Sequence, residues 1–87
     1  MVQREAVRVR VRLFASLRES VGQGELELEL PEGSTPDEVW RRIAADHPEL
    51  GGRRGRLAAA VNRRYASFDE PLSAGDEVVF IPPVSGG

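Results

Sequence analysis

The last six residues of the chain combine a stiff start with an end that has almost no side chains. Pro82 and Pro83 follow an apolar run, and Gly86-Gly87 closes the sequence. Proline fixes an extended path, and glycine permits a close backbone approach that a Cβ would block. Six extended residues span about 20 Å. We therefore expect residues 82–87 to form a flexible arm that threads a narrow channel and presents the carboxylate of Gly87 inside a partner's active site.

The other side chains that could do chemistry do not form a recognisable catalytic set. The only histidine, His47, precedes a proline at an expected helix end, which favours an ordinary surface position. Three adjacent carboxylate pairs fall at a helix start or in turns, where backbone hydrogen bonding explains them: Asp37/Glu38, Asp69/Glu70 and Asp76/Glu77. The chain has no cysteine, so it supplies neither a thiol nor a disulfide, and one histidine excludes a multi-histidine metal site. We expect no metal site and no bound cofactor.

Length and charge narrow the class of protein. The chain has 87 residues, enough for one domain, and a net charge of -2. That charge argues against a protein whose main function is non-specific binding to nucleic acid or to an anionic membrane. No apolar run approaches the roughly 20 residues of a membrane helix, and the N-terminus lacks a signal-peptide pattern. We expect a small cytoplasmic domain that binds neither nucleic acid nor membrane.

Arginine supplies all twelve basic residues, so the chain contains no lysine. Five of these arginines fall in a loop at 51–56 and in the turn that follows the next strand: Arg53, Arg54, Arg56, Arg63 and Arg64. A flexible loop with a solvated basic surface is the ordinary interpretation of such a cluster. Contact with a phosphate or with an acidic partner is the alternative.

Hydrophobic periodicity predicts the strands that must position the tail. Residues 7–14 and 25–30 alternate with period two, with arginines on the outer face of the first and glutamates on that of the second. We expect these strands to pair antiparallel, so that opposite charges face each other. A short helix is expected between them, at 15–21. Further strands are expected at 57–61, at 65–68 and at 78–81, the last of them buried on both faces.

A longer helix is predicted from Pro36 to about Asp46. A hydroxyl residue caps its start, proline takes the first position and two acids follow in the first turn. One main helix that crosses a mixed four- to five-stranded sheet, with a short helix in addition, is the ubiquitin-like β-grasp arrangement, an α+β fold. In it the last strand lies centrally, parallel to the first. We assign residues 1–81 to this domain and residues 82–87 to the flexible tail.

Several segments resemble the small, sulfur-carrying subunit of molybdopterin synthase. They are residues 57–62, 67–72, 75–78 and 80–87, together with Leu13-Phe14-Ala15 and Arg18-Glu19 near the start. The ending Pro82-Pro83-Val84-Ser85-Gly86-Gly87 is the most specific part. The resemblance covers nearly all of the chain from Val7 onward, whereas residues 1–6 have no reliable counterpart and the loop at 51–56 is individual to this sequence.

The resemblance implies that the chain carries sulfur on its last residue. A terminal carboxylate is ionised at neutral pH and is a poor electrophile, so it must be activated. In the family a separate adenylating enzyme uses ATP to form an acyl-adenylate on the last glycine, here Gly87, and a sulfur donor converts it to a thiocarboxylate. The tail, including Val84, Ser85 and Gly86, then inserts into the large subunit. There the sulfur passes to cyclic pyranopterin monophosphate to make the dithiolene of molybdopterin.

In this family the small subunit has no active site of its own. The resemblance implies a sulfur-donor subunit of a transferase complex, with the acid–base residues of the synthase in the large subunit. It also implies a heterotetramer of two small and two large subunits. The chain's own contribution is then delivery and positioning of the sulfur.

A docking surface is implied as well. Phe14 falls on the arginine face of the first strand, Tyr65 begins a short strand, and Ile81 is the last apolar residue before the prolines. In the family, residues at these positions form an apolar patch that docks on both partners; closure of the barrel end is the alternative. Arg18 matches a family arginine that pairs with an acid on the adenylating enzyme, and an ordinary surface charge is the alternative.

Three other functions stay open from the sequence. Sulfur carriers for thiamin, cysteine or tRNA thiolation share the fold and the Gly-Gly end, but usually lack the full Phe-Ile-Pro-Pro-Val-Ser run. A ubiquitin-like protein modifier would use the same end to form isopeptide bonds with other proteins. A plain β-grasp binding module would not use its tail, so deletion of Gly87 would leave its function intact.

Overall fold

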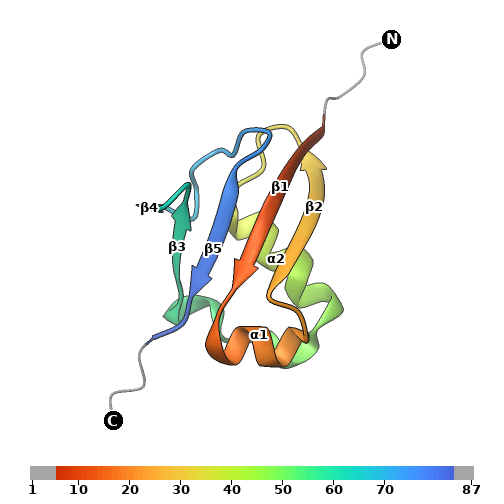
Figure 1. Ribbon diagram of the computed structural model, residues 1–87, viewed down its shortest axis with the longest axis vertical. Coiled ribbons are helices and arrows are strands. Elements are labelled where there is room, and N and C mark those ends of the chain that lie inside the picture. The colour runs from red at the N-terminus through yellow and green to blue at the C-terminus, as the bar shows by residue number, and fades with distance from the viewer. Residues whose placement is uncertain (1–5, 84–87) are drawn as a thin grey trace.

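The structure is a computed structural model that describes residues 6–83 of the chain. Its five strands form one sheet in the order β2-β1-β5-β3-β4 (Figure 1). In chain order the elements are β1 (Ala6–Leu13), α1 (Ala15–Val21), β2 (Glu25–Pro31), α2 (Pro36–Asp46), the 3₁₀ turns η1 (Pro48–Leu50) and η2 (Arg54–Arg56), β3 (Ala58–Val61), β4 (Arg64–Ala66) and β5 (Glu77–Ile81). None of the helices in this part of the chain is long and apolar enough to cross a membrane.

The first and last strands lie side by side at the centre of the sheet and run parallel (Figure 1). β1 pairs antiparallel with β2 on one side, and β5 pairs antiparallel with β3 on the other. The ubiquitin-like β-grasp fold, its first hairpin and its central last strand are therefore confirmed. Both central strands point towards the end of the sheet where α1 lies, so the chain leaves the sheet there (Figure 1).

The charged outer face of the first hairpin has the predicted register but few close ion pairs. The opposed residues are Arg8 and Glu29, Arg10 and Glu27, and Arg12 and Glu25. Among the described residues of β1 and β2, only the diagonal pair Arg10 and Glu25 comes within 4.0 Å. Arg12 reaches across to Glu77 of β5 instead, with Nη1 and Oε2 3.8 Å apart. Both pairs lie at the surface, where each contributes about 0–1 kcal/mol.

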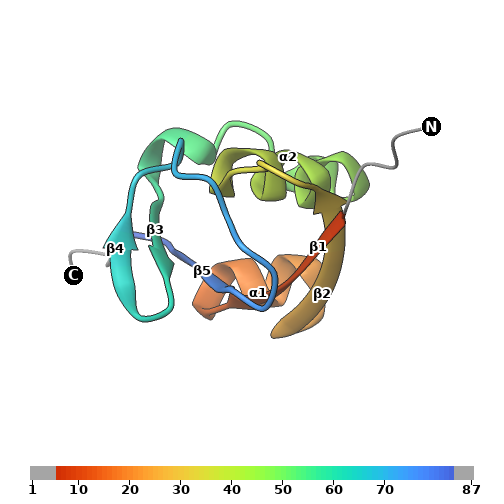
Figure 2. The ribbon, with the colours of Figure 1, turned by 90° about the horizontal axis from the view of Figure 1, so that it is seen from above.

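The main helix α2 begins with a capping box. The hydroxyl of Thr35 accepts from the backbone N–H of Glu38 at 3.3 Å, and the Glu38 carboxylate accepts from the N–H of Thr35 at 3.2 Å. Figure 2 shows α2 lying along one side of the sheet. Its buried Trp40 meets the ring of Phe80 edge to face, with centroids 5.3 Å apart.

Only one face of the central strand β5 is covered. Val78 and Phe80 are fully buried, whereas Val79 and Ile81 keep part of their surface exposed. The prediction that residues 78–81 are buried on both faces is therefore wrong. The prediction fails because the helices of a β-grasp fold pack against a single face of the sheet. An apolar residue on the other face therefore stays accessible. This exposure matters for the site described below.

The segment at 51–56 consists of a turn followed by the short 3₁₀ turn η2. Its backbone closes tight turns, in which the N–H of Arg56 donates to the carbonyl of Arg53 at 3.0 Å. Arg54 does not belong to a solvated basic surface, because its Nε donates to Oδ1 of Asp37 at 2.7 Å, at the start of α2. The sequence could not show this contact, since the two residues are 17 positions apart.

A two-residue turn joins β3 to β4 and lies against the start of β5. Asn62 and Arg63 both have positive φ, 51° and 71°, as a type I′ hairpin turn requires. The Asn62 amide donates from Nδ2 to Oδ1 of Asp76 at 2.9 Å, and its Oδ1 accepts from the N–H of Glu77 at 3.0 Å. Arg64 already belongs to β4, which ends at Ala66, so the strand expected at 65–68 is shifted and shorter.

Candidate functional site

β5 ends at Ile81, and two prolines carry the chain away from the sheet. Ile81 pairs with Ala58 in the last antiparallel pair between β5 and β3. Pro82 has no N–H with which to extend the ladder, so pairing ends there. Pro82 is half-buried and Pro83 is exposed. The remaining tail residues of the prediction lie outside the described residues: Val84, Ser85, Gly86 and Gly87.

Apolar side chains run across the outer face of the sheet, from the tail exit to the edge strand β4. Residues that pair directly across neighbouring strands share a face. Val79 of β5 pairs with Ala60 of β3, and Ala60 pairs with Tyr65 of β4. We call this surface the outer apolar stripe, which consists of Phe14, Ala58, Ala60, Tyr65, Val79 and Ile81.

Two aromatic residues stand out at the ends of the outer apolar stripe. Phe14 is 44% exposed and Tyr65 is 81% exposed, and they are the exposed large apolar side chains of the described chain. A depression of about 700 Å³ at the tail exit is lined by Phe14, Ala15, Ser16, Val79, Ile81, Pro82 and Pro83. The stripe is not exposed throughout, because Ala60 in its middle keeps only 8% of its surface accessible. Exposed apolar surface with aromatic residues is typical of protein interaction sites. The structure thus brings Phe14 and Ile81 together beside the prolines, and places Tyr65 at the far end of the stripe.

The backbone at Ala15 turns Phe14 out of the sheet. β1 ends at Leu13, and the carbonyl of Phe14 accepts from the N–H of Leu17 at 3.1 Å as α1 begins. Ala15 has a φ of 52°, in the left-handed region that costs an L-residue about 1–2 kcal/mol. The Arg12 guanidinium lies 5.6 Å from the centroid of the Phe14 ring. The strained turn and the cation together hold the ring at the surface.

Arg18 lies apart from the tail exit. Its side chain rests against Gly24, where an added Cβ would stand 3.1 Å from the Arg18 Nε. Together with Arg12, Gly24 and Glu25 it lines a polar pocket of about 290 Å³. None of the prolines lines that pocket. Arg12 is the link between Arg18 and the outer apolar stripe, because it also contacts the ring of Phe14.

Sequence reasoning missed the middle of the outer apolar stripe. Val79 lies in a continuous apolar run whose two faces alternation could not separate, and Ala58 and Ala60 lie in a run of alanines. The available signal was the register. Once β4 pairs with β3, an exposed Tyr65 and its partner Ala60 must share the outer face.

The described residues present an apolar surface beside the tail exit. They hold no group of three or more His, Cys, Asp or Glu side chains arranged for a metal ion. His47 caps the end of α2, with its Nδ1 3.7 Å from Oε2 of Glu49. An apolar surface beside a stiff exit therefore suits delivery of the segment after Pro83 to another protein.

Sequence comparison relates the chain to sulfur carriers. The model described as the ThiS family matches residues 11–87. The molybdopterin synthase sulfur carrier subunit of Escherichia coli is 42% identical over 81 residues, which cover 91% of this chain and 99% of that protein. The Arabidopsis thaliana protein of the same name is 34% identical over 82 residues, covering 94% of this chain and 85% of that protein.

Structural comparison finds the same fold in subunits of molybdopterin converting factors and in a small archaeal modifier protein. A Pyrococcus furiosus protein named molybdopterin converting factor subunit 1 aligns with a TM-score of 0.79 and 36% identity, covering 90% of this chain and 99% of that one. Small archaeal modifier protein 1 (SAMP1) of Haloferax volcanii aligns with a TM-score of 0.80 and 28% identity, covering 92% and 99%. A chain in the complex of subunits 1 and 2 of the Helicobacter pylori molybdopterin-converting factor aligns with a TM-score of 0.63 and 26% identity, covering 93% and 100%.

Proposed function

The chain belongs to the ThiS family, and we propose that it is the sulfur-carrier subunit of a molybdopterin synthase. The observation that carries this proposal is the 42% identity to the Escherichia coli subunit over 91% of this chain and 99% of that protein. The geometry supports it, because an outer apolar stripe with exposed Phe14 ends where Pro82 and Pro83 lead the chain off the sheet. A carrier needs such a surface to dock while its tail is being used.

In this role the chain delivers sulfur that other proteins activate and use. The terminal carboxylate of Gly87 attacks ATP on a separate adenylating enzyme, which releases pyrophosphate and leaves an acyl-adenylate. Sulfur at the oxidation level of sulfide then displaces AMP, so that Gly87 ends in a thiocarboxylate. In the synthase this sulfur passes to cyclic pyranopterin monophosphate and becomes part of the molybdopterin dithiolene. We place these steps in the cytoplasm.

A large subunit is the first partner. The Helicobacter pylori structure is a complex of subunits 1 and 2 of a molybdopterin-converting factor, and its small chain shares this fold. The outer apolar stripe offers a surface on which a large subunit docks while the tail enters its active site. The adenylating enzyme, its contact with Arg18 and a heterotetramer of two small and two large subunits are further parts of the proposal, and they rest on the family resemblance.

Protein modification is the second candidate, because the fold is equally close to that of SAMP1. A modifier also needs an activated C-terminal glycine, so the two functions share their first step. They diverge afterwards, since a modifier forms an isopeptide bond with another protein instead of releasing sulfur. This chain contains no lysine, so it cannot form chains through its own side chains.

Intact mass spectrometry tests the first step. The protein is incubated with ATP, a sulfide donor and the adenylating enzyme of the same organism. We expect a mass increase equal to the replacement of one oxygen by sulfur, localised to Gly87, and no increase in a variant that lacks Gly87. A folded wild-type protein that gains no sulfur would contradict the carrier function.

A second stage separates the pathways. The large subunit and cyclic pyranopterin monophosphate are added to the sulfur-loaded protein. We expect the mass to return to that of the carboxylate form as molybdopterin appears. Sulfur loading without this return would move the chain to another sulfur pathway, and isopeptide conjugates in cell extract would favour the modifier.

A further inference from the structure

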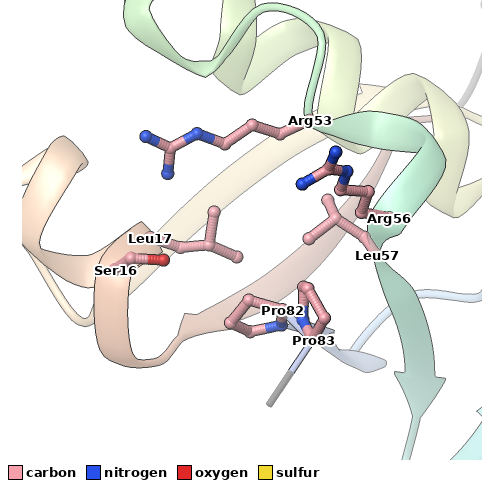
Figure 3. A pocket seen from close by; sticks show the side chains of 7 residues that line it. All are labelled: Ser16, Leu17, Arg53, Arg56, Leu57, Pro82 and Pro83. Carbon is pink, nitrogen blue, oxygen red and sulfur yellow. The ribbon is translucent and has the colours of Figure 1, made fainter. Parts of the chain in front are cut away.

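A second pocket shares the tail exit with the outer apolar stripe. Its volume is about 200 Å³, and it is lined by Ser16, Leu17, Arg53, Arg56, Leu57, Pro82 and Pro83. Figure 3 shows the side chains of Arg53 and Arg56 reaching over one space, with Leu17 and Leu57 beneath them and the prolines at the base. The pocket therefore has an apolar floor and two guanidinium groups at its rim. We call Arg53 and Arg56 the arginine pair.

The backbone turn explains why the arginine pair acts together. Arg53 caps η2 and Arg56 ends it, and the N–H of Arg56 donates to the carbonyl of Arg53 at 3.0 Å. In a 3₁₀ turn, side chains three positions apart lie on the same side, because one turn takes 3.0 residues. The spacing thus directs both guanidinium groups into the same pocket and sends the intervening Arg54 elsewhere.

Arg54 anchors this turn to the body of the protein. Its Nε donates to Oδ1 of Asp37 at 2.7 Å, and its guanidinium lies 3.4 Å from the centroid of the Phe68 ring. Asp37 also accepts Arg41, at 3.1 Å between Oδ2 and Nη2. One member of the cluster is therefore structural, and it fixes the position of the other two.

The arginine pair has no acidic partner in the described part of the chain. Within residues 6–83, no carboxylate oxygen lies within 4.0 Å of either guanidinium group. Two like charges beside an apolar floor favour an anion that pairs with both. The planar guanidinium fork matches a carboxylate especially well, since it donates two parallel hydrogen bonds.

We propose that the arginine pair binds an aspartate or glutamate side chain of the large subunit when the tail is inserted. This inference rests on the proposed function, because it requires that partner. A protein segment with an apolar residue beside its carboxylate fits both the floor and the rim of the pocket. Ser16, Pro82 and Pro83 line this pocket and also the depression at the outer apolar stripe, so one docked partner covers both.

The pair would also give the complex its specificity. The segments that resemble sulfur-carrier subunits include the tail at 80–87 and leave out residues 51–56. Charged contacts at the edge of an interface discriminate between partners, since a partner without the carboxylate leaves the cations unpaired. The tail thus supplies the chemistry common to the family, and the arginine pair selects this carrier's own large subunit.

The lack of lysine allows a direct test by cross-linking. The variant Arg56→Lys has one side-chain amine, and a zero-length carbodiimide reagent joins an amine only to a carboxylate that touches it. We expect an amide bond between residue 56 and an aspartate or glutamate of the large subunit, identified by peptide mass spectrometry. The matched control is Arg63→Lys, whose amine lies in the exposed β3–β4 turn and should give little or no cross-link.

Affinity measurements provide a second test of the arginine pair. We expect the double variant Arg53→Glu/Arg56→Glu to bind the large subunit at least about tenfold more weakly, with a shallower dependence on salt. Arg63→Glu/Arg64→Glu carries the same change of charge and should stay within about twofold of wild type. The neutral double variant Arg53→Gln/Arg56→Gln removes the charges without reversing them. A thermal melt of every variant distinguishes loss of binding from loss of folding.

The outcomes distinguish this inference from the proposed function. The wild-type protein could load and transfer sulfur although residue 56 gives no cross-link and neither double variant at 53 and 56 changes binding. That result would overturn this inference and leave the proposed function intact. A wild-type protein that neither takes up sulfur nor binds the large subunit would overturn both. A cross-link to the adenylating enzyme and none to the large subunit would assign the pocket to activation, and so reject the inference as stated.

Discussion

The guanidinium of Arg54 lies 3.4 Å from the centroid of the Phe68 ring, and Phe68 in turn stacks on the core residue Phe80 with centroids 6.0 Å apart. The same arginine pairs with Asp37 at the start of α2. One side chain therefore joins η2, the main helix and the aromatic core. This link holds the 51–56 segment, and with it one wall of the pocket at the tail exit.

Replacement of Arg54 by alanine should lower the free energy of unfolding by about 1–2 kcal/mol. The variant loses a partly buried ion pair and a cation–π contact, and partial exposure of both groups keeps the loss moderate. Urea unfolding measures the change. The free energy of unfolding of Arg54→Lys should lie between those of the wild type and Arg54→Ala, because an ammonium keeps the charge but loses the planar stacking surface. Arg42→Ala is the control on the exposed side of α2, and an equal loss there would contradict the assignment.

Asn62→Ala should lower the free energy of unfolding by about 1–2 kcal/mol. The amide makes hydrogen bonds to Asp76 and to the N–H of Glu77, and alanine would also have to adopt a φ of 51°. Thermal and urea unfolding monitored by circular dichroism provide the measurement.

A glycine at the same position separates the two causes. Asn62→Gly loses the hydrogen bonds but accepts positive φ without strain, so its loss should be smaller by about 1 kcal/mol than that of Asn62→Ala. Equal losses in the two variants would show that the backbone conformation contributes nothing.

Phe14→Ala should weaken binding of the large subunit by about tenfold and change the stability of the isolated chain by less than about 1 kcal/mol. Phe14 keeps 44% of its surface exposed in the isolated chain, and a docked partner would cover this remaining part. Tyr65→Ala, at 81% exposure, should leave stability unchanged and weaken binding by a smaller factor. Titration calorimetry measures both. Glu29→Ala on the edge strand β2 is the control, and comparable weakening there would reject the outer apolar stripe as the docking surface.

Replacement of Ala15 by glycine should stabilise the protein, and replacement by valine should destabilise it. Its φ of 52° is strained for alanine, so Ala15→Gly should gain about 0.5–1 kcal/mol. Ala15→Val should lose about 1–3 kcal/mol, since a β-branched residue rarely adopts this conformation. Opposite signs for the two variants in the same unfolding assay are the decisive result.

The pairing of β1 with β2 could be predicted from the sequence pattern, and the central place of β5 from the β-grasp arrangement. Alternation placed Val7, Val9 and Val11 inward, and opposite charges on 7–14 and 25–30 selected their pairing. Thr35 and Pro36 marked the start of α2 by local chemistry alone. These are interactions between residues close in sequence or in neighbouring strands.

What could not be predicted depends on contacts distant in sequence or on which sheet face is covered. The apolar run around Val79 predicts a core residue. Val79 lies at the surface because the helices pack against only one face of the sheet. Arg53 and Arg56 differ from Arg54 in nothing but the direction that the 3₁₀ turn gives them. The roles of Phe14, Arg18, Tyr65, Ile81 and the tail in partner binding stay predictions until binding is measured.

The central position of β5 bears on how the protein is made. β5 pairs with both β1 and β3, while β2 pairs only with β1 and β4 only with β3, so the sheet without β5 would be two separate hairpins. Isolated two-stranded hairpins are marginally stable at best. β5 also follows the other four strands of the sheet in the chain, so it is synthesised after them. A chain cut short before it cannot complete its sheet, so an unfinished product goes to proteolysis instead of occupying partners as a decoy that carries no sulfur.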